Sequence, residues 1–123
     1  MSAIKEKPAT WQQARQNGRA LYAWRRSVGL NRAVFARLAN FSERSLATYE
    51  KQEQLPEVVR PQINEAVRLV KALLEIIPAA GLAAWLREPN SGFGGQAPWA
   101  LIQQGERDLL WRMIHQTQQG AFA

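Results

Sequence analysis

The chain has 123 residues, 46% of them hydrophobic, which suits one ordinary domain or two small ones that share a core. It contains no cysteine, which excludes disulfides, thiol catalysis and thiolate metal sites and fits a cytoplasmic protein. No apolar run approaches about 18 residues, and the opening MSAIKEKPAT lacks an apolar stretch of signal-peptide length. The sequence therefore predicts neither a membrane span nor a secretion signal.

The net charge of +6 is unevenly distributed along the chain. Residues 1–60 carry eleven Lys/Arg and five Asp/Glu, whereas residues 61–123 carry five of each. All of the excess positive charge falls on the N-terminal half, which would attract a polyanion such as nucleic acid. Basic residues that merely solvate an exposed face would give the same asymmetry, so charge alone leaves both explanations open.

Glycine, proline and capping residues divide the N-terminal half into helices. A helical pattern opens at Pro8 and Thr10, is weakened or interrupted at Gly18, and ends at Gly29. Its apolar positions are Trp11, Ala14, Leu21, Trp24 and Val28.

Two short helices with a tight turn between them are predicted next. Asn31 should cap the first and Ser42 the second, because their side chains accept hydrogen bonds from free backbone N–H groups. Asn40 suits the turn, since asparagine tolerates a left-handed backbone. The second helix ends at or just before Leu55-Pro56. The inward faces of the two helices are predicted to be Val34, Phe35, Leu38, Leu46 and Tyr49.

The C-terminal half is predicted to be helical as well, with no strand-like alternation. A long helix from about 61 to 77 has a broad apolar stripe and should pack against both halves, whose boundary falls near residues 54–61. Further helices are expected at 79–87, 98–104 and 106–118, with a loop at 90–96. We therefore expect an all-α fold with domains at 1–60 and 61–123.

Residues 29–50 have the layout of a helix-turn-helix, in which the second helix presents its first polar side chains to DNA bases in the major groove. Arg44 can fork onto guanine, and Glu43 can accept a hydrogen bond from cytosine. Arg32 and Lys51 are placed to hold phosphates. A plain helical bundle with fortuitous spacing is the alternative. The predicted DNA-binding residues are Arg32, Ser42, Glu43, Arg44, Ser45, Thr48 and Lys51.

Several features of this segment stand in a recognisable order: Leu30-Asn31, Phe35-Ala36, the turn Asn40-Phe41-Ser42, Leu46 and Tyr49-Glu50. In this order the segment resembles the Xre (Cro/phage-repressor) class of helix-turn-helix. That class usually has Gln or Glu where Arg32 stands, and Gly where Asn40 and Gln52 stand. The resemblance implies a homodimer that binds an inverted repeat in operator DNA, as twofold pairing of a small reader also favours.

A second ordered set runs through the C-terminal half: Trp85-Leu86, Pro89-Asn90, Gly94-Gly95, Pro98, Gly105 and Gly120. Over about residues 65–123 the chain resembles the toxin-binding domain of Xre/MbcA/ParS antitoxins. The resemblance implies a type II antitoxin that represses its own operon and neutralises a RES-type toxin, which consumes or transfers from NAD. It also implies that residues 116–123 block the toxin's active-site cleft. The toxin-binding residues it suggests are Trp85, Gln116, Gln119, Gly120, Ala121, Phe122 and Ala123.

The aromatic residues of this half allow two explanations from physical chemistry alone. Tryptophan is typical of partner interfaces, yet Trp85 and Trp111 could equally fill the core of a small domain. Phe122 follows the helix-ending Gly120, so it is either frayed or held in a partner's cleft.

No catalytic or metal site is predicted. His115 is the only histidine, and a surface histidine with a helix-capping Asp108 explains this pair better than a Ser-His-Asp arrangement. Residues 92–95 lack the lysine of a phosphate-binding loop. We therefore expect no enzyme and no cofactor. The alternative to an antitoxin is a helix-turn-helix transcription regulator whose C-terminal domain dimerises or senses a ligand, without a toxin partner.

Overall fold

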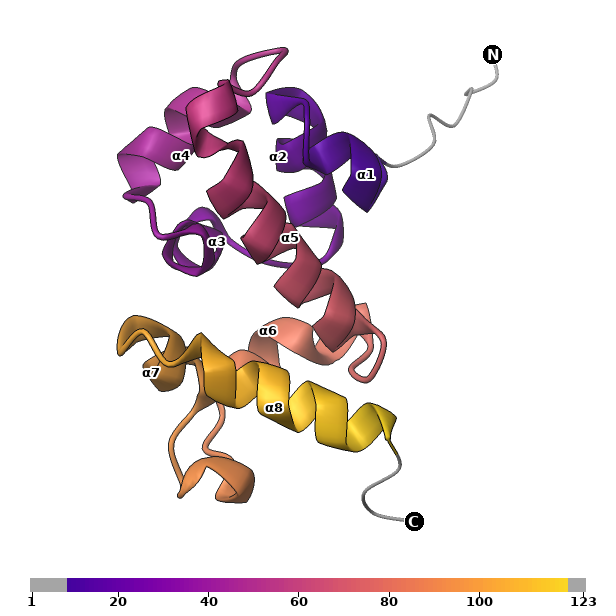
Figure 1. Ribbon diagram of the computed structural model, residues 1–123, viewed down its shortest axis with the longest axis vertical. Helices are drawn as coiled ribbons and strands as arrows, with labels where there is room; N and C mark the ends of the chain where they lie inside the picture. Colours follow the sequence, from indigo (N-terminus) through magenta and orange to yellow (C-terminus); the bar gives the residue numbers. More distant parts are fainter. Residues whose placement is uncertain (1–8, 120–123) are drawn as a thin grey trace.

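The computed structural model describes residues 9–119, which form eight α-helices and two short 3-10 turns, η1 and η2. These residues contain no strand, so the predicted all-α fold is confirmed. Figure 1 shows α1 to α4 grouped at one end and α6 to α8 at the other, with α5 running between the two groups.

The first helical pattern of the sequence forms two separate helices, α1 (Trp11–Ala14) and α2 (Gly18–Ser27). Thr10 caps α1, since its hydroxyl accepts from the backbone N–H of Gln13, and Asn17 caps α2. The interruption at Gly18 has a steric cause. A Cβ atom at this buried glycine would lie 2.0 Å from the carbonyl oxygen of Tyr49, so only glycine lets α2 begin here.

The two short helices are α3 (Arg32–Ala39) and α4 (Glu43–Glu50). The side chain of Asn31 accepts from Val34 N at 2.9 Å, and that of Ser42 accepts from Ser45 N at 3.0 Å. Asn40 has the left-handed backbone that was predicted, with φ of 63°. Both caps and the turn are therefore confirmed. Phe35, Leu38 and Leu46 are fully buried, Val34 is buried and Tyr49 is half-buried.

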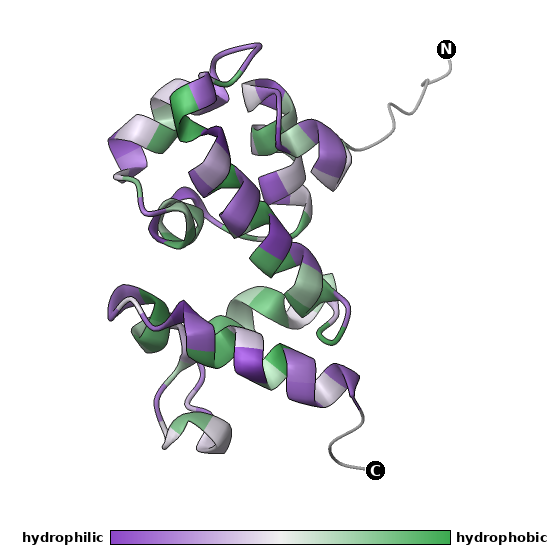
Figure 2. Ribbon diagram, viewed as in Figure 1, coloured by the Kyte–Doolittle hydropathy of each residue, from purple (hydrophilic) through white to green (hydrophobic). Residues whose placement is uncertain are grey.

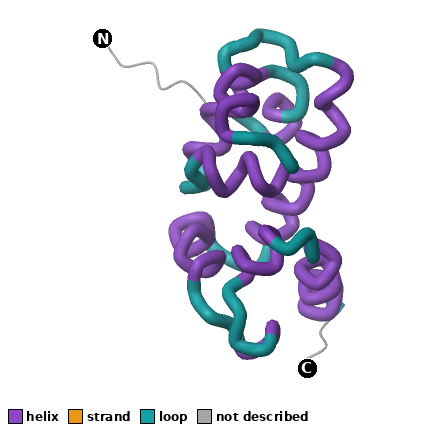
Figure 3. The backbone as a smooth tube through the Cα atoms, turned by 90° about the vertical axis from the view of Figure 1, so that its left-hand side faces the viewer, coloured by secondary structure: helices purple, strands orange, loops and turns teal. Residues whose placement is uncertain are grey.

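The long helix α5 (Arg60–Leu74) follows the 3-10 turn η1 (Glu57–Val59) and ends three residues earlier than the predicted Ile77. Pro78 disfavours helical backbone at Ile77, the residue before it, so the helix does not reach the predicted end. The helix packs against α1 and α3 on one side and against α6 and α8 on the other, as expected. Figure 3 shows this connection between the two groups of helices from a second direction.

The remaining elements follow the prediction closely: α6 (Ala79–Arg87), η2 (Ser91–Phe93), α7 (Pro98–Gln103) and α8 (Arg107–Gln118). The 3-10 turn η2 lies inside the predicted loop. Gly105 has a φ of 79°, which ends α7 and turns the chain into α8.

Except for Leu101, the buried apolar side chains of the described residues form one cluster that extends from Ala14 in α1 to Ile114 in α8. Figure 2 shows hydrophobic and hydrophilic residues alternating along α5 and α8, as expected of helices with one buried face. Between residues 9 and 119, no single helix is long and apolar enough to cross a bilayer; Glu57–Leu74 and Ala79–Arg87 reach that extent only as a pair bent by 106°.

Two side chains from the C-terminal half hold the end of α3. Arg107 in α8 donates from Nη1 to the backbone oxygen of Leu38, and Gln62 in α5 donates to that of Ala39 at 3.3 Å. The last carbonyls of a helix have no partner within it, so these two bonds satisfy groups that would otherwise need water.

Candidate nucleic-acid interface

The first turns of α4 present polar side chains to solvent, as predicted. Ser42, Glu43, Arg44 and Thr48 are exposed, and Ser45 is half-buried. Among the hydrogen bonds and ion pairs of residues 9–119, none involves the Glu43 carboxylate or the Arg44 guanidinium. These two side chains therefore keep their full hydrogen-bonding capacity for a ligand.

The three hydroxyl groups at this surface are partly used within the helix. Ser42 and Ser45 hydrogen-bond to each other through their Oγ atoms at 3.0 Å, in addition to the capping bond. Thr48 donates from Oγ1 to the backbone oxygen of Arg44 at 3.2 Å. The serines thus stabilise the start of α4, and the outward charge comes from Glu43 and Arg44.

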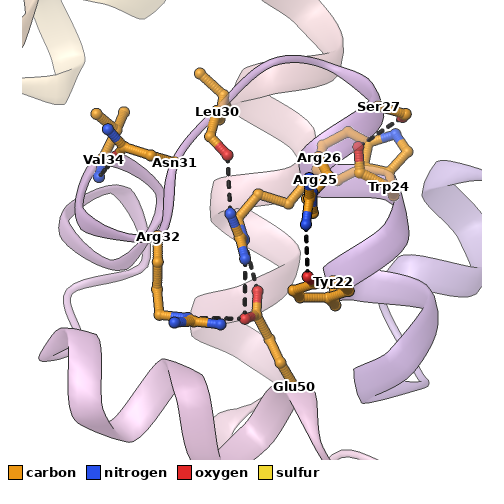
Figure 4. A network of polar contacts seen from close by, with 10 residues as sticks. All are labelled: Tyr22, Trp24, Arg25, Arg26, Ser27, Leu30, Asn31, Arg32, Val34 and Glu50. Atoms are coloured by element: carbon orange, nitrogen blue, oxygen red, sulfur yellow. Dashed lines mark hydrogen bonds and ion pairs between the residues drawn. The ribbon is translucent and has the colours of Figure 1, made fainter.

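A buried ion pair fixes the other end of α4 (Figure 4). Glu50 accepts from Nε of Arg25 at 2.6 Å and from Nη2 at 3.1 Å, and both residues are no more than 5% exposed. Nη1 of Arg25 donates to the backbone oxygen of Leu30 at 2.9 Å. One guanidinium therefore joins α2, the segment before α3, and α4. Sequence reasoning did not single out Arg25, because nothing local marks a charged residue as buried.

Arg32 shares the same carboxylate. Its Nε donates to Oε1 of Glu50 at 3.0 Å, while 39% of its side chain remains exposed. The ion pair holds Arg32 beside α4, and the phosphate contact expected of it stays a prediction. Lys51, the other predicted phosphate ligand, is exposed at the C-cap of α4.

Two neighbouring hollows flank this network, one of about 460 Å³ and one of about 340 Å³. Tyr22 and Arg32 line both. Arg26 lines the first and donates to the Tyr22 hydroxyl at 2.8 Å, a hydrogen bond that raises the pKa of Arg26 above its usual value. Arg19 and Lys51 line the second.

Arg19 and Arg26 are basic residues at this surface that the sequence-based site did not include. Both are exposed, and with Tyr22 they stand three and four residues apart along α2. That spacing places them on one helix face. The spacing alone predicts a basic face on this helix. Only the structure shows that this face lies beside Arg32 and Lys51.

The residues suggested for toxin binding are spread over the C-terminal half. Trp85 in α6 is half-buried and meets Phe93 edge to face, with ring centroids 6.4 Å apart. Gln116 in α8 is exposed and lines a groove of about 460 Å³ together with Phe93 and Met113. Gln119 is exposed, and Gly120–Ala123 lie outside the described residues. Phe93 therefore contacts Trp85 and also lines the groove that Gln116 lines.

Among residues 9–119, no three His, Asp or Glu side chains gather into a group that could hold a metal ion. Comparison of this chain with models of known protein families, with curated proteins and with solved structures finds no match. The site is therefore interpreted from its own geometry and chemistry.

Proposed function

We propose that the N-terminal half binds duplex DNA by placing the start of α4 in the major groove. The observation that carries this proposal is the outward, unpaired pair Glu43 and Arg44 on a helix capped by Ser42 and anchored by Glu50. Base edges are read by such side chains, and phosphates by cations beside them. Arg32 and Lys51 are the cations beside α4 that we assign to phosphates, and twofold pairing on an inverted repeat would double the bases read.

We further propose that the chain is an antitoxin of a type II toxin–antitoxin system. In this role residues 116–123 would block the active site of a RES-type, NAD-consuming toxin, and α4 would repress the operon that encodes both proteins. The support is the order of Trp, Pro and Gly residues in the C-terminal half, with Gln116 exposed at the end of α8. A transcription regulator without a toxin partner is the second candidate, favoured by the surface of α4 alone.

The DNA proposal is tested by selecting duplexes from a random pool and measuring binding of the selected site by the Arg44→Ala variant. Loss of a good base contact should weaken binding by about 1–3 kcal/mol and relax preference at one position. Arg87→Ala is a matched control, because Arg87 is exposed at the end of α6. Equal binding by the native chain and Arg44→Ala would contradict the proposed reading helix.

The antitoxin proposal is tested by co-expression with the product of the neighbouring gene, followed by an NAD-depletion assay. The two proteins should purify together, and NAD loss should be prevented. Deletion of Gly120–Ala123 should abolish protection while DNA binding persists. Protection that survives the deletion excludes the blocking segment, and failure to co-purify favours the regulator without a toxin.

A further inference from the structure

A groove of about 420 Å³ lies between α1, α5 and α8, away from the surface of α4. In Figure 1, α1 and α4 stand on opposite sides of α5. Two half-buried tryptophans, Trp11 and Trp111, lie at its walls, and the apolar side chains of Ala72 and Ile114 contribute to its lining. The groove thus draws on both halves of the chain, and of the two predicted sites only the segment 116–123 reaches it, through Gln118.

Three cations and one carboxylate line the groove: Arg15, Arg68, Lys71 and Glu75. Lys71 lies 3.7 Å from Glu75, an ion pair in which both side chains are at least 40% exposed. Arg68 lies 3.5 Å from Glu65 in a similarly exposed pair. Exposed pairs of this kind stabilise a fold by about 0–1 kcal/mol, so a partner's carboxylates can replace them at little cost.

The tryptophans hold these cations in place. Lys71 Nζ lies 4.8 Å from the ring centroid of Trp11, and the guanidinium of Arg15 lies 5.6 Å from it. The guanidinium of Arg68 lies 5.9 Å from the ring of Trp111. Cation–π contacts orient the charges before a ligand arrives, which lowers the entropy lost on binding. Tryptophan and arginine are also the residues that dominate binding energy at protein interfaces.

We propose that this groove docks an acidic peptide segment of a protein partner, with carboxylates on Arg15, Arg68 and Lys71 and an apolar side chain between the indoles. The positive lining matches such a segment in charge, and the apolar walls match its anchor. An unpaired nucleic-acid strand is the competing ligand for a basic groove with aromatic side chains, and its displacement of the peptide is therefore one outcome of the test. The groove is separate from α4, so this inference does not rest on the proposed DNA binding.

The test uses the full chain and a short labelled peptide that alternates Asp or Glu with Leu or Phe, followed by fluorescence anisotropy. The native chain should bind it, and Arg68→Glu with Lys71→Glu should weaken binding by about tenfold or more, since each change sets like charges against the peptide. Arg112→Glu is the matched control, because Arg112 is exposed on α8 and lines a different groove. It should bind nearly as tightly as the native chain.

Two further probes separate the peptide from other ligands. A peptide with Asn and Gln in place of Asp and Glu should bind at least about tenfold more weakly. A single-stranded oligonucleotide should not displace the acidic peptide at equal concentration. Unchanged binding by the Arg68→Glu, Lys71→Glu variant, or displacement by the oligonucleotide, would overturn the proposal. Thermal unfolding of both variants checks that the helices remain folded. We expect that they do, because all three substituted side chains are partly or fully exposed.

Discussion

The α-carbon of Gly18 lies so close to the backbone of Tyr49 that no side chain fits between them. An added Cβ would stand 2.0 Å from the carbonyl oxygen of Tyr49 and 2.4 Å from that of Gln52. Both are backbone atoms, which cannot rotate away as a flexible side chain would. The start of α2 and the end of α4 are therefore held at a separation that depends on glycine.

Gly18→Ala is expected to destabilise the fold by about 1–3 kcal/mol or more, because the backbone of α2 or α4 must shift to admit a methyl group. Urea unfolding measures the change. Gly81→Ala is the matched control, since Gly81 lies inside α6 with nothing within 4 Å of an added Cβ. It should leave stability unchanged or raise it by about 0.5–1 kcal/mol through better helix propensity. Equal effects of the two substitutions would contradict this account.

Glu50→Ala is expected to cost about 3–5 kcal/mol, because it leaves the buried guanidinium of Arg25 without its carboxylate. Arg26→Ala removes an exposed neighbour on the same helix and should change stability by about 0.5 kcal/mol or less. Denaturant unfolding of both variants makes the comparison. A Glu50→Ala variant as stable as Arg26→Ala would show that Arg25 can reach water without unfolding the chain.

Asn40→Ala should destabilise the fold by about 1 kcal/mol, because alanine adopts a left-handed backbone with a φ of 63° less readily than asparagine does. The Asn40→Gly variant should be at least as stable as the native chain, since glycine adopts this backbone freely. Thermal unfolding separates the two variants. The prediction is wrong if alanine is tolerated as well as glycine.

Lys51→Ala should weaken binding to different DNA sequences about equally and reduce the salt dependence of log K by about one, as expected for one lost phosphate contact. Titrations of selected and unrelated duplexes at several salt concentrations give both quantities. Arg87→Ala, far from α4 in the sequence, provides the baseline. A sequence-dependent loss with Lys51→Ala would place this lysine against bases instead of phosphates.

Local features of the fold could be predicted from the sequence. Thr10, Asn31 and Ser42 cap helices because a short polar side chain reaches the backbone three residues ahead, an interaction contained within four residues. Asn40 marks the turn for an equally local reason. The outward position of Glu43 and Arg44 followed from helical periodicity once Leu46 was assigned to the core.

Long-range features could not be predicted in this way. Arg25 and Glu50 are 25 residues apart, and nothing in the sequence distinguishes them from solvated charges. The same holds for Gly18, whose need for glycine arises from a carbonyl on another helix. Arg32 was placed correctly at the start of α3, but its hydrogen bond to Glu50 depends on how α3 and α4 cross.

The last two carbonyls of α3 make the N-terminal half depend on the C-terminal half. They are satisfied by Arg107 and Gln62, which lie beyond residue 60, where the surplus positive charge ends. The two halves that differ in charge are therefore expected to unfold together. A fragment that ends at residue 60 would lose both donors that satisfy the last carbonyls of α3. A ligand that binds α8 would therefore contact a helix that is itself bonded, through Arg107, to the end of α3.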